Sequence, residues 1–124
     1  MPLPYIEPWL LEGLSTMKLI FAIVQDYDAN ELVKEISAAG FRATRIASTG
    51  GFLRVGNTTL MIGVEDYQVR KVIRLIDQYC RQRTETVQPE VIGDFHEWYP
   101  AEMVDVVVGG ATIFVVNVVR FERI

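Results

Sequence analysis

The sequence FRATRIASTGGFLRVGNTTLMIGVED, residues 41–66, contains the pattern that decides the fold. It has two strand-like runs, Phe41–Ser48 and Thr58–Glu65, rich in apolar and β-branched residues. The connection between them is rich in residues that tolerate unusual backbone conformations: Gly50, Gly51, Gly56 and Asn57. The same connection carries Phe52 and Leu53, although short loops are usually polar. The stretch predicts two strands joined by a loop whose apolar residues need a cover.

Upstream of this stretch the pattern changes from a strand to a helix. Leu19–Gln25 is apolar at both sets of alternating positions, which predicts a strand with two apolar faces. Asp28 with Glu31 three residues later is typical of a capping box, so we expect a helix to begin there. Apolar residues at helical spacing then continue to Gly40, which predicts an amphipathic helix packed against the sheet.

Downstream, Asp66 is expected to cap a second amphipathic helix that ends near Cys80, and Arg81 and Arg83 are expected on a solvated face. Thr84–Ala101 reads as a long connection, a feature that is often functional. It holds an aromatic cluster of Phe95, His96, Trp98 and Tyr99. The cluster fits a lid packed on the domain edge and a ligand-contacting segment equally well.

The last part of the chain carries two β-branched runs, Met103–Val108 and Thr112–Val119. Gly109, Gly110 and Ala111 join them, which favours a β-hairpin. The whole order, β-α-β-β-α-β with an extra strand, predicts an α+β, ferredoxin-like (split βαβ) domain in which two helices cover one face of an antiparallel sheet. We assign residues 17–124 to this domain and residues 1–16 to an N-terminal extension.

The second sheet face has no predicted cover within the chain. The first strand and the last two runs are apolar on both sides, and each apolar side chain left in water forgoes about 1.5–3 kcal/mol of burial. We therefore expect this face to be buried between subunits. A closed ring is the expected assembly, because it leaves no exposed sticky end.

Composition narrows the classes of function. A net charge of −4 with interspersed signs disfavours binding to a nucleic acid polymer. The single Cys80 is expected to be a buried structural residue, and one His96 with one cysteine predicts no metal site. No apolar run reaches the roughly 20 residues of a membrane span, and no signal sequence is evident, so we expect a cytoplasmic protein with no membrane partner. The absence of paired carboxylates or a nucleophile–base pattern favours a non-catalytic protein without a cofactor.

Three segments resemble the PII-like cyclic-di-AMP receptor family of small bacterial signalling proteins. They are MKLIFAIVQD (Met17–Asp26), the opening stretch with its combination of ASTGGFL and GNTT, and VGGATIFVV (Val108–Val116). The resemblance implies a ferredoxin-like homotrimer with cyclic di-AMP bound in each cleft between subunits. It also implies a sensor whose loops reorder on ligand binding and so change the surface offered to a protein target, which the sequence does not identify.

The resemblance assigns ligand contacts to seven positions of this chain: Arg42, Ala43, Thr44, Phe52, Leu53, Asn57 and Gly63. Two further candidates are Gly51, where the backbone can approach a ligand closely, and Arg123, which stands in place of a family contact. An aromatic such as Phe52 suits an adenine ring, the Thr44 hydroxyl suits an adenine edge, and Arg42 suits a phosphate. Other functions stay open for some of these residues. Asn57 fits an ordinary turn equally well, and Arg42 also fits a solvated strand position.

Two departures from the family pattern leave the ligand open. Gly40 stands where the family commonly has an asparagine, and Arg123 stands where it has a glutamine. Arginine cannot accept a hydrogen bond as an amide does, although it can meet a phosphate. The alternatives are therefore a PII-like trimer that binds another adenine nucleotide, ATP or AMP, and a structural trimer without a ligand.

Overall fold

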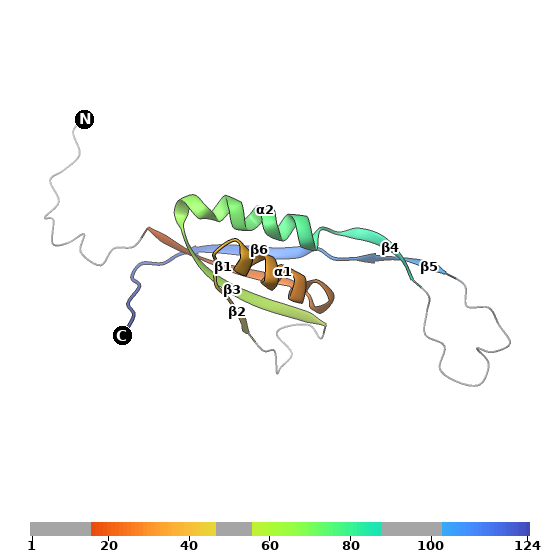
Figure 1. Ribbon diagram of the computed structural model, residues 1–124, viewed down its shortest axis with the longest axis horizontal. Coiled ribbons are helices and arrows are strands. Elements are labelled where there is room, and N and C mark those ends of the chain that lie inside the picture. The colour runs from red at the N-terminus through yellow and green to blue at the C-terminus, as the bar shows by residue number, and fades with distance from the viewer. Residues whose placement is uncertain (1–15, 47–55, 88–102) are drawn as a thin grey trace, which may run out of the picture.

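The computed structural model describes residues 16–46, 56–87 and 103–124. Its elements in order are β1 (Met17–Gln25), α1 (Asp26–Ala38), β2 (Ala43–Ile46), β3 (Asn57–Glu65), the short 3₁₀ helix η2 (Asp66–Gln68), α2 (Val69–Cys80), β4 (Arg83–Val87), β5 (Val104–Val108) and β6 (Ala111–Asn117). The main sheet is antiparallel, with the strand order β2-β3-β1-β6. Both helices lie on one side of it (Figure 1). This arrangement confirms the predicted α+β, ferredoxin-like fold.

A second, two-stranded sheet projects away from the main body as an arm made of β4 and β5 (Figure 1). The predicted hairpin between the last two strands is therefore wrong, because β5 pairs with β4 whereas β6 pairs with β1. Gly109 and Gly110 have φ of +84° and +97°, and these left-handed conformations turn the chain out of the arm and into the main sheet. The predicted long connection is also shorter than expected, because its first residues form β4.

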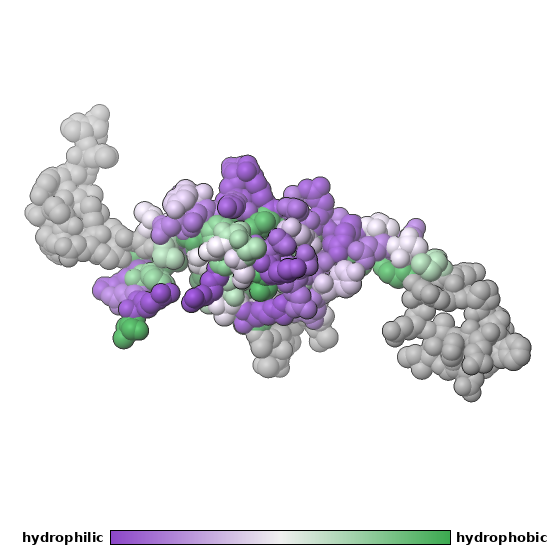
Figure 2. All heavy atoms as spheres, in the orientation of Figure 1, coloured by the Kyte–Doolittle hydropathy of each residue, from purple (hydrophilic) through white to green (hydrophobic). Residues whose placement is uncertain are grey.

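The core lies between the helices and one face of the main sheet. Alternate residues of β1 and β3 point to this face and are almost completely buried, among them Ile20, Ala22, Leu60 and Ile62. They pack against apolar residues of both helices: Leu32, Ile36, Val72 and Ile76. The outer side of the helices carries mostly hydrophilic side chains (Figure 2). This one-sided burial follows because alternate strand residues share one face of the sheet and apolar residues three or four apart share one face of each helix.

Cys80 belongs to the same core, as predicted, with 1% of its surface exposed. Burial raises the pKa of its thiol to about 11, with a smaller contribution from the Asp28 carboxylate. The thiol is therefore protonated near neutral pH. A protonated, buried cysteine behaves as a small apolar residue and not as a nucleophile.

The other sheet face is apolar and faces away from both helices. Phe21 and Phe114 are direct cross-strand neighbours there, beside Leu19 and Val116. Phe114 is 55% exposed and Val116 is 41% exposed. Within the described part of the chain, the helices leave this open face uncovered.

Both predicted helix caps are wrong. The helix α1 begins directly after β1, with Gln25 at the N-cap and no side-chain cap bond, and Asp28 lies inside it. At the second helix, Glu65 caps η2 in a capping box with Gln68, whose side-chain oxygen accepts the Glu65 amide proton at 2.9 Å. Asp66 lies one residue further on, 3.8 Å from Lys18 Nζ. The acidic residues near each helix start therefore indicated the approximate position of the helix, but they did not identify its N-cap residue.

Candidate functional site

The described residues that the resemblance assigns to a ligand fall into separate places. One group lies where β2 begins, beside β3. Ala43 is half-buried and pairs with Ile62, whereas Thr44 is exposed and pairs with Met61 on the open face. Arg42 precedes the strand and is exposed. This group offers a hydroxyl, main-chain polar atoms and a cation along one short edge.

Gly63 belongs to the same region, on the open face of β3. Its backbone does not require glycine, because its φ is not positive. A Cβ placed on it would meet only Met17 Cε, at 3.6 Å, which is an ordinary contact. Nothing in the described chain therefore demands a glycine here. The missing side chain leaves room on the surface for a group from outside the chain.

Arg42 differs from its neighbour Arg45 in its contacts with the described residues. Arg45 donates a hydrogen bond to Asn30 Oδ1 of α1, whereas Arg42 makes no hydrogen bond or ion pair with any described residue. An exposed guanidinium without a carboxylate partner is available to an anion. The geometry thus agrees with a phosphate contact for Arg42.

Asn57 lies in a second place, at the opposite end of β3, where it pairs with Gln25. It helps to line a hollow of about 360 Å³. The other polar groups that line it include Gln25, Gln82, Thr112 and the turn Gly109–Gly110. Among the described residues, three carboxamides and a hydroxyl line this hollow and no charged side chain does. Such a lining suits a neutral heterocycle that both donates and accepts hydrogen bonds.

The two places are far apart within one chain. Asn57 and Gly63 are six residues apart on β3, which at the rise of a strand corresponds to about 20 Å. No single nucleobase could contact both. Arg123, which is exposed and forms no ion pair with a described residue, follows β6 beyond the Met17 end of the sheet. Gly51, Phe52 and Leu53 lie outside the described residues.

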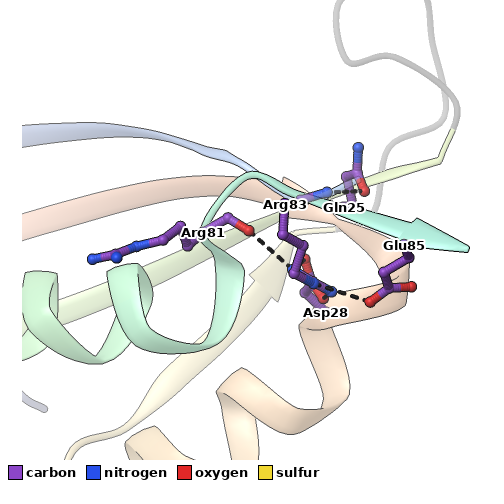
Figure 3. Close-up of polar contacts among 6 residues, drawn as sticks. Gln25, Asp28, Arg81, Arg83 and Glu85 are labelled. Atoms are coloured by element: carbon purple, nitrogen blue, oxygen red, sulfur yellow. Dashed lines mark hydrogen bonds and ion pairs between the residues drawn. The ribbon is translucent and has the colours of Figure 1, made fainter. Parts of the chain in front are cut away.

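A charged cluster lies beside the hollow, where β4 meets α1 (Figure 3). The Asp28 carboxylate, 5% exposed, accepts hydrogen bonds from Arg83 Nη2 at 2.7 Å and from Nη1 at 3.3 Å. Arg83 also donates to Glu85 Oε1 at 3.0 Å and to the Arg81 carbonyl at 3.1 Å. These hydrogen bonds, above all the one to Asp28, raise the pKa of Arg83, so it stays charged.

The prediction that Arg83 lies on a solvated face is therefore wrong, whereas Arg81 does lie there and pairs with Asp77. The sequence holds one signal that could have found the Asp28 contact. Asp28, Leu32 and Ile36 are spaced by four residues, so the acid lies on the apolar stripe of α1. An acid on the buried stripe needs a cation, although nothing in the sequence points to a residue 55 positions away.

Among the residues with a described structure, no group of three or more His, Cys, Asp or Glu is placed to hold a metal ion. None of the helices in the described ranges combines the length and the apolar character that a membrane span requires.

Comparison with known proteins gives three findings. Residues 17–124 match the model of a family described as cyclic-di-AMP receptor. The chain is also similar to a functionally unknown protein from Pediococcus pentosaceus, known from a crystal structure, with 40% identity and a TM-score of 0.71 over 88% of this chain and 98% of that one. A more distant likeness, 20% identity and a TM-score of 0.49, relates it to the PII protein of Arabidopsis thaliana bound to citrate, over 84% and 76% of the two chains. A likeness at that level carries no information about a ligand.

Proposed function

Because residues 17–124 match its model, the chain belongs to the cyclic-di-AMP receptor family, and we propose that it is a non-catalytic signalling protein that binds cyclic di-AMP. We place the site between subunits of a homotrimer. The observation that carries this placement is the separation along β3 between Asn57 and Gly63, about 20 Å by strand rise. Two places that cannot share a base within one chain can meet across a boundary between two chains.

The open sheet face supports the assembly. Phe114, Val116 and their neighbours on β1 form an apolar surface that the helices of their own chain leave uncovered. Burial of such side chains is worth about 1.5–3 kcal/mol each, so association through this face is favourable. In a closed ring the open face of every subunit is covered. The expectation of three subunits comes from the family resemblance.

Each of the described residues is matched to a ligand group by its chemistry. In this proposal Arg42 meets a phosphate, and Thr44 with the main chain of Ala43 meets the edge of an adenine. Gly63 leaves space for the ligand on the sheet, and Asn57 contacts the second base from the neutral hollow. Gly51, Phe52 and Leu53 complete the contacts, with Phe52 stacking on an adenine.

Signalling requires that the ligand prefers one arrangement of the chain. We propose that binding reorders the Gly50–Asn57 loop and the Thr84–Ala101 segment, whose first residues belong to β4. This reordering alters the surface offered to a protein target. A ligand can shift such an equilibrium only by its difference in affinity for the two arrangements. The target is a protein whose identity neither the fold nor the site specifies.

Isothermal titration with cyclic di-AMP tests the function, run beside ATP, AMP and cyclic di-GMP. We expect cyclic di-AMP to bind at about one molecule per subunit, as one shared cleft per chain requires. Arg42→Met should weaken binding, with Arg70→Met on the exposed side of α2 as the matched control. Absence of heat with cyclic di-AMP, or its hydrolysis during the titration, would overturn the proposal.

A second candidate ligand follows from Arg123. This cation is exposed and without an ion pair among the described residues, at a position where the family has a glutamine. An additional phosphate would satisfy it, so ATP is the alternative. If ATP binds and cyclic di-AMP does not, and Arg123→Gln reverses the preference, this second candidate replaces the first.

A further inference from the structure

The hollow beside the glycine turn has two walls from different parts of the chain. Asn57, at the start of β3, belongs to one wall. Gly109 and Gly110, between β5 and β6, belong to the other. Both walls are bonded to one short stretch, Gln25–Asp28, where β1 passes directly into the first turn of α1.

Asp26 holds the wall that contains Asn57. Its backbone N–H donates a hydrogen bond to the Gly56 carbonyl at 2.8 Å, and its side-chain Oδ1 accepts one from the Thr58 hydroxyl. The residues on both sides of Asn57 are thus bonded to Asp26. Because a side chain turns with its backbone, these two bonds fix the direction in which the Asn57 amide can point.

Gln25 and Asp28 hold the opposite wall. Gln25 Oε1 accepts the Gly109 amide proton at 2.7 Å, and Asp28 binds the guanidinium of Arg83 (Figure 3). That guanidinium packs against the glycine. A Cβ at Gly109 would lie 2.7 Å from Arg83 Nη1 and 2.4 Å from the Arg81 carbonyl oxygen, which is too close for any side chain. The ion pair and the turn therefore fit together in one arrangement.

The ion pair is built to be rigid. Asp28 is almost completely buried, and Arg83 offers it two donors of a planar fork, so the pair has little freedom to rearrange. Loss of Arg83 would leave the Asp28 carboxylate without its cation, which is costly at a buried position. The pair thus keeps the glycine wall at a fixed position relative to α1.

We propose that the first turn of α1 positions both walls of the ligand-binding hollow, with Asp26, Asp28 and Arg83 as positioning residues. They act on the ligand through Asn57, Gln25 and the glycine turn. The inference rests on the proposed function, because it takes the hollow as part of the cyclic-di-AMP site. One consequence is that the walls are coupled: a change that loosens one wall loosens the other, and the coupling is reciprocal.

Amide hydrogen exchange of the ligand-free protein, read by NMR, tests the coupling directly. Arg83→Met removes the guanidinium fork, and Arg81→Met removes an exposed arginine that pairs with Asp77. We expect the amides of Gly109 and Asp26 to exchange about tenfold faster in Arg83→Met and to change less than about twofold in Arg81→Met. Faster exchange at Gly109 with no change at Asp26 would overturn the coupling.

A milder pair of variants tests the reverse direction and covers the case in which Arg83→Met does not fold. Thr58→Val removes the hydroxyl bonded to Asp26. Thr16→Val removes a similar hydroxyl–carboxylate bond, to Glu65, at the far end of the sheet. We expect Thr58→Val alone to raise the exchange rate of the Gly109 amide, by about threefold or more. Equal rates in the two variants would refute a shared anchor.

Titration with cyclic di-AMP then connects the walls to binding. We expect Thr58→Val to raise the Kd about fivefold at unchanged stoichiometry, with Thr16→Val like wild type. Arg83→Lys should bind more tightly than Arg83→Met. An unchanged Kd in Thr58→Val would overturn the positioning role. A wild-type protein that shows no heat with cyclic di-AMP would refute the proposed function instead, and the exchange rates would still decide the coupling.

Discussion

The strand β1 has two faces that are alike in sequence and different in environment. Ile20, Ala22 and Val24 point toward the helices and are at most 1% exposed. Phe21 and Ile23, between them, point to the open face and are only partly buried within the chain. If water covered the second face, the strand would be expected to alternate between apolar and polar residues. The apolar residues on the open face therefore indicate that another surface covers it. In the proposed trimer, that surface belongs to a neighbouring subunit.

The largest expected effect is on assembly. Phe114→Glu places a carboxylate on the β6 side of the open face. If another subunit covers this face, the buried charge without a partner costs several kcal/mol. In sedimentation equilibrium we expect the mass to fall from three chains to one chain of 14.1 kDa. Lys34→Glu, on the exposed side of α1, is the control and should keep the mass of wild type. A Phe114→Glu protein that still sediments as three chains would contradict the role of this face.

A second test compares the two faces on the same strand. Ile20→Ala should lower the free energy of unfolding by about 2–5 kcal/mol, because it removes a side chain from a closely packed core. Ile23→Ala should cost less in a dissociated background such as Phe114→Glu, because Ile23 is partly solvated in a single chain. Urea denaturation of both variants in that background measures the difference. Equal losses would show that the open face is packed within the subunit.

A smaller effect is expected on the pH dependence of the free energy of unfolding, through Cys80 in the core. Burial raises the pKa of Cys80 to about 11 in the folded protein, above its value in the unfolded chain. Above about pH 9 the unfolded chain releases the thiol proton first, so stability falls as pH rises, by at most about 1.4 kcal/mol per pH unit, until the folded thiol also ionises near pH 11. Cys80→Ala should remove this part of the decline in denaturation curves recorded from pH 8 to pH 11. A parallel decline in both proteins would assign it to other groups.

The smallest expected effect is at the surface. Arg81 and Asp77 form an exposed pair one helical turn apart, with side chains 70% and 55% exposed. Arg81→Met should change the free energy of unfolding by less than about 0.5 kcal/mol, and 0.5 M salt should hide even this change. Thermal unfolding at two salt concentrations checks it. A loss comparable to that of Arg83→Met would mean that the Arg81 side chain also supports the Asp28–Arg83 pair.

The elements with strong periodicity could be predicted from the sequence. β1 and β3 were located to within two residues from their apolar runs, and both helices to within three residues from apolar residues at helical spacing. β4 was missed because its sequence RTETV is polar, and its partner β5 follows only after a long interval. The turn Gly109–Gly110 was recognised, but a local pattern does not reveal which strands a turn connects in space.

The candidate site was predictable only in part, for a similar reason. The residues of β2 and β3 were identified through the family resemblance, and the structure adds the register that separates Gly63 from Asn57. The Asp28–Arg83 pair was not predicted, because an ion pair between residues 55 positions apart has no local signature. The ligand contacts assigned to all of these residues, on β2 and β3 as well as at Phe52 and its neighbours, stay predictions.

The arm made of β4 and β5 is attached to the main body at its Arg83 end. Each strand has five residues, which gives an arm of about 17 Å from the Arg83 end to the Val104 end. Because the Asp28–Arg83 pair has little freedom to rearrange, it fixes the direction in which the arm leaves the main body. A protein that contacted the far end would meet a short rod whose direction is set by one carboxylate of α1.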